Sequence, residues 1–368
     1  MSPFDNTEDR TLAHRLGLSR RQFLAATTGL AAGAVAAGPF APAAHAADGV
    51  LVPPAKRGII LYTVRDTISR DPLTSDLPSG FREVLTHLAD IGYRQVEFAG
   101  YGQHANAEGG ANLGNPAGAA LLRQWLDDNG LEAEGNHGGI PSTITDATLA
   151  AFDQACEVAA ILGMGHIGTG GDPTGSAQKA DWDAAAERWN ILGERAMSQF
   201  GLKLYTHNHD GAYNFLLDST PDPATGLFTR SSGTRRLEYF LTISDPAFVY
   251  LEMDIFWAFV AQHRWHTYTA PDGSSQVDVF QPLEVVQAQT TRFPLFHAKD
   301  GRRNPAVTNG YDMVPFGTGD IDFRTFFSEM GAKGLHNPMY EQDNARTFPT
   351  GSLDAAELSY QNLAALRG

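Results

Sequence analysis

Short apolar runs alternate with amphipathic stretches along most of the 368-residue chain. Eight of these runs have the length of strands: Gly58–Tyr62, Arg94–Phe98, Leu131–Gly135, Gly165–Thr169, Leu202–His207, Val249–Asp254, Pro294–His297 and Pro338–Glu341. Between them, apolar residues recur three and four positions apart, as at Phe81, Val84, Leu85 and Leu88, and this spacing predicts helices. Strands that alternate with helices predict a parallel sheet, and eight such units predict a single-domain α/β fold, the closed (β/α)8 TIM barrel.

An open, doubly wound sheet is the alternative to a closed barrel. It is less favoured because no glycine-rich phosphate-binding turn follows the first strand, where the sequence has Tyr62–Asp66 instead. Three longer segments interrupt the alternation after predicted strands, namely Asp210–Arg235, His263–Gln281 and Lys299–Asp320. Because such barrels keep their active sites at the C-terminal ends of the strands, we expect these segments to wall a substrate pocket.

The first 46 residues have the form of an export signal. Arg20 and Arg21 are followed by Gln-Phe-Leu, then by an Ala- and Gly-rich apolar stretch, and then by the small-x-small triplet Ala44-His45-Ala46. This order predicts a twin-arginine signal peptide over residues 1–46, cleaved after Ala46, and a barrel over residues 47–368. A membrane anchor is the alternative, but the apolar stretch is too short and too weakly hydrophobic to span a bilayer. We therefore expect the twin-arginine translocase as a partner during export, and a periplasmic or extracellular location.

The charge of the chain narrows the range of partners. Asp and Glu number 42 against 27 Lys and Arg, for a formal net charge of −15, which argues against nucleic acid and anionic membranes as partners. No second long apolar run occurs, so we expect no stable membrane association. The single cysteine, Cys156, cannot form an internal disulfide, and its place in an apolar helical pattern predicts a buried structural thiol.

Polar side chains follow or end six of the eight predicted strands. They are Glu97, His137, the run His207–Asp210, the pair Glu252 and Asp254, the run His297–Asp300, and the run Glu341–Asp343. In a barrel these strand ends converge, and so many carboxylates and imidazoles would repel or be desolvated unless a cation neutralises them. Each residue alone could equally be a satisfied strand end or a helix cap. Together they predict a divalent-metal site, and mixed Asp, Glu and His ligands suit Mn, Zn, Co or Mg.

Several short motifs carry a family resemblance over the length of the mature chain. In order they are Leu61–Asp66, Ile91–Tyr93 leading to Val96–Phe98, His207–Asp210, Asp254 with Phe256 and Trp257, His297–Asp300, Phe316–Gly319 and Glu341–Asp343. In this order and spacing the chain resembles the xylose isomerase-like TIM barrels, and among them the sugar phosphate isomerases and epimerases. The resemblance implies a metal held by an acidic residue after strand five, an Asp after strand six, a His after strand seven and a Glu after strand eight. By position the last three are Asp254, His297 and Glu341.

Two positions depart from that family pattern. His207 stands where the strand-five Glu is usual and is the expected replacement ligand, and His209, two residues on and on the same side of an extended strand, is its rival. Trp257 stands where many relatives carry a further His. This change disfavours the multi-zinc DNA-repair nucleases of the superfamily and leaves an indole that could stack on a sugar ring.

The resemblance implies a metal-dependent sugar isomerase or epimerase that polarises a carbonyl and moves a proton on a small sugar or keto-sugar. The proton-transfer candidates are Glu341, His209 and Glu97, and Lys299 could stabilise an enolate or form a salt bridge with Asp300 or Glu341. Candidate substrate-binding residues are Arg65, His137 and Trp257; Arg65 could instead be structural, against Asp66 or Glu97. Two further functions stay open: a lyase or hydrolase of 3-keto-glycosides on the same metal site, and a non-enzymatic carbohydrate-binding barrel.

Overall fold

The computed structural model describes residues 49–331 and 336–368. The predicted export signal, residues 1–46, lies outside the described residues. Within the described part of the chain, no helix has the length and apolar character needed to cross a membrane.

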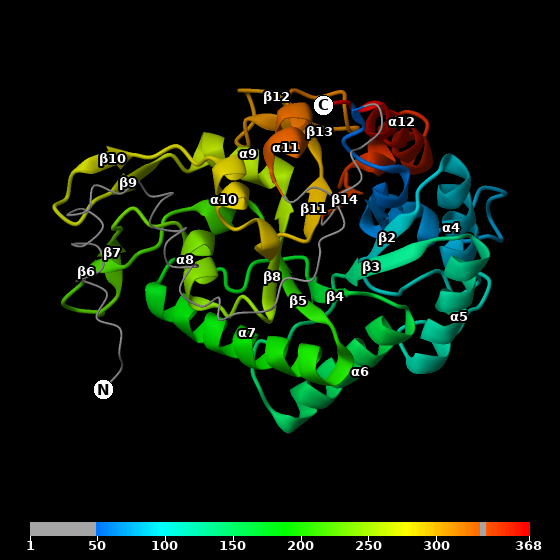
Figure 1. The fold of residues 1–368 in the computed structure, drawn as a ribbon, viewed down its shortest axis with the longest axis horizontal. Helices are drawn as coiled ribbons and strands as arrows, with labels where there is room; N and C mark the ends of the chain where they lie inside the picture. Colours follow the sequence, from blue (N-terminus) through cyan, green and yellow to red (C-terminus); the bar gives the residue numbers. More distant parts are fainter. Residues whose placement is uncertain (1–48, 332–335) are drawn as a thin grey trace, which may run out of the picture.

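Eight parallel strands form the centre of the molecule (Figure 1). They are β1 (Gly58–Ile60), β2 (Gln95–Phe98), β3 (Glu132–Asn136), β4 (His166–Thr169), β5 (Lys203–His207), β8 (Val249–Asp254), β11 (Leu295–Ala298) and β14 (Asn337–Tyr340). Hydrogen bonds join them in the order β3-β2-β1-β14-β11-β8-β5-β4. A parallel bridge between His137 and Gly168 joins the two ends of this order, so the sheet closes into the predicted barrel.

Helices surround the barrel and bury the apolar positions that their spacing indicates. They are α3 (Arg65–Ile68), α4 (Gly80–Ile91), α5 (Pro116–Asp128), α6 (Asp146–Ile161), α7 (Lys179–Phe200), α8 (Arg236–Ile243), α9 (Ile255–Arg264), α10 (Pro282–Ala288), α11 (Phe323–Glu329) and α12 (Ser352–Ala365). Phe81, Val84, Leu85 and Leu88 of α4 are all buried. Cys156 is likewise buried in α6, where burial raises its pKa to about 12, as expected of a structural thiol.

Some predicted boundaries differ from the structure. The first strand ends at Ile60, because Leu61–Val64 form the 3₁₀ helix η3, which leads into α3. The helix α9 follows β8 directly and was not predicted. Its first residues are apolar like the strand before them, so the hydrophobic pattern carries no break at the boundary.

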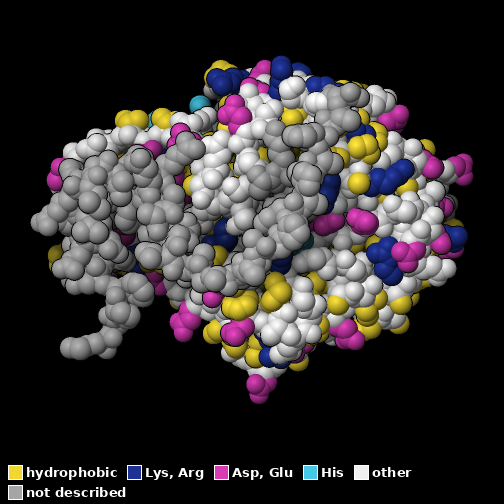
Figure 2. Space-filling view, in the orientation of Figure 1, with side chains coloured by type: hydrophobic (Ala, Val, Ile, Leu, Met, Phe, Trp, Pro, Cys, Tyr) yellow, Lys and Arg dark blue, Asp and Glu magenta, His cyan; other side chains and the backbone are white. Residues whose placement is uncertain are grey.

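The three long segments after β5, β8 and β11 each contain a two-stranded antiparallel ribbon: β6 (Ser219–Pro221) with β7 (Phe228–Arg230), β9 (Thr267–Thr269) with β10 (Ser275–Val277), and β12 (Asp300–Arg303) with β13 (Tyr311–Val314). The first two ribbons extend to the same side of the barrel (Figure 1), where the Ser231 N–H donates to the Thr269 carbonyl over 3.0 Å. On the face in Figure 2, acidic and basic side chains are interspersed among the residues that are not grey.

Tyr205, Leu295 and Met339 form a small buried cluster. It fills the part of the barrel interior that lies nearer the N-terminal ends of the strands. Glycines on neighbouring strands leave room for them. A Cβ at Gly58 would overlap the Met339 sulfur, and a Cβ at Gly168 would overlap the Tyr205 backbone and ring. Above this apolar layer, toward the C-terminal ends of the strands, the inward-facing residues become charged.

Candidate metal centre

Four side chains from four strands converge at the C-terminal end of the barrel, and we call them the outer group: His207 at the end of β5, Asp254 at the end of β8, His297 in β11 and Glu341 just after β14. One donor atom from each lies within 4.8 Å of the others, and all four residues are buried. His297 Nδ1 is 2.8 Å from Glu341 Oε2 and 3.9 Å from Asp254 Oδ2, and His207 Nε2 is 3.4 Å from the same Asp254 oxygen.

Asp254 is held so that one of its oxygens faces the group. Its Oδ1 accepts the Trp257 N–H over 2.9 Å, which caps the N-terminus of α9. Its own N–H donates to Asn208 Oδ1 over 3.2 Å. Its Oδ2 has no hydrogen-bond partner, although the Lys299 ammonium lies 3.3 Å away.

The polar atoms of the outer group fit a divalent cation. His207 is 2% exposed, and neither of its ring nitrogens has a hydrogen-bond partner. Leaving such atoms buried and unpaired is costly, and a cation is one partner that satisfies an imidazole nitrogen and carboxylate oxygens together. Two imidazoles and two carboxylates form a ligand set that suits Zn, Mn or Co.

Lys299 lies beside the outer group. Its Nζ is 2.8 Å from Asp343 Oδ2, 3.1 Å from Glu341 Oε2 and 3.3 Å from Asp254 Oδ2. Of the two salt-bridge partners considered from the sequence, Glu341 is therefore present and Asp300 is not. Asp300 instead accepts the N–H groups of Gly301, Gly317 and Gly319.

These contacts shift the pKa values of the group in opposite directions. Burial, and then the Glu341 charge, raise the pKa of Asp254 to about 7, against the effect of Lys299. Burial would raise the pKa of Glu341, but Lys299 and His297 hold it well below its usual range. Burial and the neighbouring His297 and His137 lower the pKa of His207, so this imidazole is neutral and its nitrogens can act as ligands.

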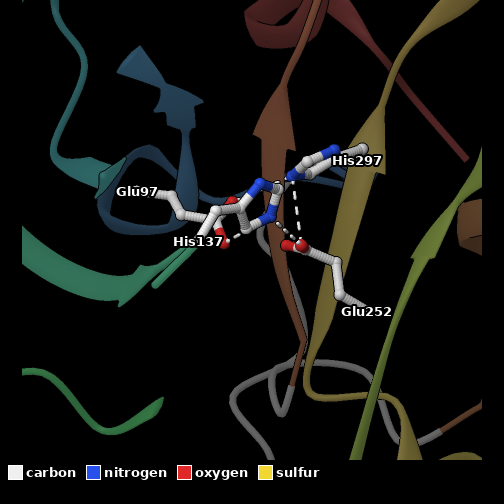
Figure 3. Close-up of side chains that lie close together, drawn as sticks. All are labelled: Glu97, His137, Glu252 and His297. Carbon is white, nitrogen blue, oxygen red and sulfur yellow. Dashed lines mark hydrogen bonds and ion pairs between the residues drawn. The ribbon is translucent and has the colours of Figure 1, made fainter. Parts of the chain in front are cut away.

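A second set of converging side chains lies deeper in the barrel, and we call it the inner group: Glu97 of β2, His137 after β3, Glu252 of β8 and again His297 (Figure 3). His297 Nε2 is 2.8 Å from Glu97 Oε2 and 3.2 Å from Glu252 Oε2. His137 Nε2 is 3.0 Å from Glu252 Oε2 and 3.3 Å from Glu97 Oε1. His297 thus faces one group with each ring nitrogen.

The remaining predicted site residues divide between the inner group and the rim. The structure places Glu97 and His137 in the inner group. His209 is exposed at the rim, with its ring centroid 5.2 Å from that of His207 and 5.4 Å from that of Trp257. His207 rather than His209 therefore joins the converging donors at strand five.

Arg65 also lies near the strand ends, but its guanidinium is engaged by the chain itself. It donates to the carbonyls of Tyr62 over 2.7 Å and Asp343 over 2.8 Å and stacks on the Tyr62 ring. Neither Asp66 nor Glu97, the partners considered from the sequence, accepts from it among these contacts.

Three residues of the site were not individually named from the sequence as ligands, bases or substrate contacts: Glu252 and Asp343, which were noted only among the polar strand ends, and Tyr205. Tyr205 donates its hydroxyl proton to Glu97 Oε1. Glu252 and Tyr205 each lie two residues before an outer-group ligand on the same strand, so their side chains share its inward face. The spacing of two residues before His207 in β5, and before Asp254 in β8, was the sequence signal that could have identified Tyr205 and Glu252.

Comparison with known proteins agrees with the architecture. A family model described as "Xylose isomerase-like TIM barrel" matches residues 85–365. A sugar phosphate isomerase/epimerase from Parabacteroides distasonis is 22% identical, with a TM-score of 0.57 over 89% of this chain and 98% of that one. No curated protein matched this chain.

Two further solved structures share the fold at lower identity. A probable 3-DHS dehydratase involved in petrobactin synthesis from Bacillus anthracis is 14% identical, with a TM-score of 0.54 over 84% of this chain and 98% of that one. A xylose isomerase-like TIM barrel protein from Mycobacterium smegmatis, in complex with magnesium, is 16% identical, with a TM-score of 0.50 over 84% and 96%. At these identities the likeness concerns the fold alone.

Proposed function

This chain belongs to the family of xylose isomerase-like TIM barrels, and we propose that it is a divalent-cation-dependent isomerase or epimerase of sugars. The observation that carries the proposal is the outer group. Four buried donors from four strands meet there, and both nitrogens of His207 are without a partner. The fold that this chain shares with a sugar phosphate isomerase/epimerase and with a magnesium complex is compatible with this reaction class and with a divalent cation.

His207, Asp254, His297 and Glu341 are the residues that would hold the cation. When bound there, a divalent ion supplies a Lewis acid that polarises a sugar carbonyl and acidifies the neighbouring C–H bond. The protein itself supplies a positive charge beside this cation site, the Lys299 ammonium. Lys299 is enclosed by Asp254, Glu341 and Asp343, which raise its pKa although burial opposes this, so it stays an ammonium that can stabilise negative charge on a substrate oxygen.

We assign proton transfer to His209. Glu97, one of the alternatives, directs its two oxygens to Tyr205, His137 and His297 in the inner group. Glu341, the other alternative, is a proposed ligand whose low pKa makes it a weak base. His209 is exposed at the rim beside Trp257. Partial burial of its ring, and then the nearby Lys299 charge, lower its pKa, so the imidazole is neutral at physiological pH and can accept a proton. Trp257 then offers an apolar face for the sugar ring.

A lyase acting on 3-keto-glycosides is the second candidate. The same acidified C–H bond would lead to loss of a substituent instead of reprotonation, and the fold shared with a probable 3-DHS dehydratase is compatible with this candidate. The two reactions share their first proton transfer and differ only in the product.

Exchange of a substrate hydrogen with solvent tests both candidates. The protein, loaded with Mn²⁺, Co²⁺, Zn²⁺ or Mg²⁺, is incubated in D₂O with keto-sugars and 3-keto-glycosides, and deuterium next to the carbonyl is followed by NMR. We expect exchange in the loaded protein, its loss together with the cation in Asp254→Asn, and a decrease of about 10²–10⁴-fold in His209→Gln with the cation retained. Asn also caps helices well, so α9 should keep its start.

The outcomes of this test separate the possible functions. Exchange with an isomer as product supports an isomerase or epimerase, and exchange with release of a substituent supports the lyase. Sugar binding that persists in Asp254→Asn without any exchange in the loaded wild type would instead support a carbohydrate-binding barrel. Full activity in His209→Gln would contradict the assignment of the base.

A further inference from the structure

The ammonium group beside the outer group is already paired with the chain's own carboxylates. Three oxygens surround Lys299 Nζ, those of Asp343 at 2.8 Å, Glu341 at 3.1 Å and Asp254 at 3.3 Å. An ammonium carries three hydrogens, so there is one carboxylate for each of them. Asp254 and Glu341 belong to the outer group, whereas Asp343 takes no part in it and its side chain is 31% exposed. Asp343 therefore covers Lys299 on the side that faces solvent.

The loop after β11 contains an anion-binding arrangement that is also filled. The backbone N–H groups of Gly301, Gly317 and Gly319 donate to the Asp300 carboxylate over 2.7, 2.9 and 2.9 Å. Converging N–H groups bind anions, and TIM barrels frequently bind phosphate with the loops after strands seven and eight, which are β11 and β14 here. Asp300 is 1% exposed, and a Cβ at Gly319 would overlap it, so the loop closes tightly on this carboxylate.

Two arginines after the strands also have partners within the chain. Arg65 donates to the carbonyls of Tyr62 and Asp343. Arg264 donates to Asp210 Oδ2 over 2.9 Å. A guanidinium that turned from these groups to a ligand would lose the hydrogen bonds it already makes. Neither side chain is therefore preorganised to hold a phosphate.

The formal charge of the site also disfavours an anionic substrate. Five carboxylates lie within ion-pairing distance of Lys299, His137 or His297, namely Glu97, Glu252, Asp254, Glu341 and Asp343. Lys299 and one divalent cation in the outer group supply three positive charges against these five. A phosphate group adds about 1.5–2 negative charges at pH 7, and bringing like charges together in a partly desolvated site is costly.

We propose that the substrate of this site is a sugar without a phosphate group, and that Asp343 is the residue that excludes phosphorylated sugars. This inference rests on the proposed function and adds its substrate class. The Lys299 charge still acts on the partial negative charge that develops on a substrate oxygen during the reaction. A phosphate on the substrate, in contrast, would meet the Asp343 carboxylate and would have to displace it from Lys299.

Matched pairs of free and phosphorylated keto-sugars test the inference. The Mn²⁺-loaded protein is incubated in D₂O with D-fructose or its 6-phosphate, and with D-ribulose or its 5-phosphate, and kcat/KM is obtained from deuterium incorporation. In wild type we expect kcat/KM for the free sugar to exceed that for its phosphate by about 100-fold. Asp343→Asn, which keeps the size of the side chain, should reduce this ratio by about tenfold through a lower KM for the phosphate.

Asp90→Asn is the matched control. Asp90 is an exposed carboxylate in the last turn of α4, which leads toward the N-terminal end of β2. The variant therefore changes the net charge by the same amount, away from the strand ends that form the site, and its ratio should equal that of wild type. Calorimetric titration of each loaded protein with the same sugars measures binding without turnover.

The possible results distinguish failure of this inference from failure of the proposed function. Faster exchange of the phosphorylated sugars in wild type would overturn the inference and leave the proposed function intact. A preference for free sugars that is unchanged in Asp343→Asn would overturn the role of Asp343. No exchange with any sugar, together with tighter binding of the free member of a pair, would overturn the proposed function and support the substrate class. Binding of neither member of either pair would contradict both.

Discussion

Asp254 links the helix that follows β8 to the candidate metal centre. One of its oxygens caps α9 and the other faces His207 and His297. Because the cap fixes the side chain, the second oxygen is oriented before any cation arrives. The sequence located this residue by its position in the family pattern, an Asp at the end of a strand.

The ionisation of Asp254 predicts how cation binding depends on pH. Its pKa is raised from 3.8 to about 7 in the cation-free chain. Between these pH values the unfolded chain releases a proton that the folded chain keeps, so the free energy of unfolding decreases as pH rises. A bound cation needs the ionised form and offsets this loss of stability. Below about pH 7 protons compete, and affinity should fall about tenfold per pH unit. Calorimetric titration with Mn²⁺ between pH 5.5 and 7 measures this, and a flat profile would contradict it.

At this scale the sequence predicted the outer group but not the inner one. The outer-group residues stand at the ends of apolar strands, where a polar residue is easily recognised. His207 was assigned because it occupies the strand-five ligand position of the family pattern. Glu252 and Tyr205 lie within strands, one pair of residues deeper, and their partners Glu97 and His137 come from distant segments. Which carboxylate meets which imidazole depends on the stagger of neighbouring strands, which a single sequence does not contain.

At the scale of elements, the alternation of strands and helices predicted all eight barrel strands to within a few residues. The three ribbons were not predicted. The strands of the first two are mostly exposed and have no apolar period, and the buried start of β12 is formed by Asp300 and Gly301, which are not apolar. Val277 of β10, for example, is 70% exposed. Closure of the barrel also depends on the isolated bridge between His137 and Gly168. This bridge joins β3 to β4, which have no continuous ladder of hydrogen bonds between them.

Gly168 offers a test of how closely β4 and β5 approach each other. Its added Cβ would overlap the backbone of the neighbouring β5 at Tyr205, so Gly168→Ala should lower the free energy of unfolding by about 1–3 kcal/mol. Gly165, three residues earlier, has open space at its Cβ, and Gly165→Ala should change stability by less than about 0.5 kcal/mol. Urea unfolding of both variants measures the difference. Equal stability would mean that β4 and β5 do not approach as closely as described.

At the scale of the whole molecule, we propose that Arg20 and Arg21 direct export by the twin-arginine route. We expect Arg20→Lys combined with Arg21→Lys to retain the precursor in the cytoplasm of its host, as measured by fractionation and immunoblotting. Arg10→Lys combined with Arg15→Lys makes the same chemical change outside the motif and should leave export unaffected. Normal export of the first variant would exclude the twin-arginine route.

The central claim is that the barrel binds a divalent cation between the ends of β5, β8, β11 and β14. The most direct test is an anomalous difference map from a crystal of the protein soaked in Mn²⁺. The account predicts a peak bounded by His207, Asp254, His297 and Glu341, together with its loss in Asp254→Asn. A fully soaked crystal without a peak among these four side chains would contradict the proposed cation site and the function built on it.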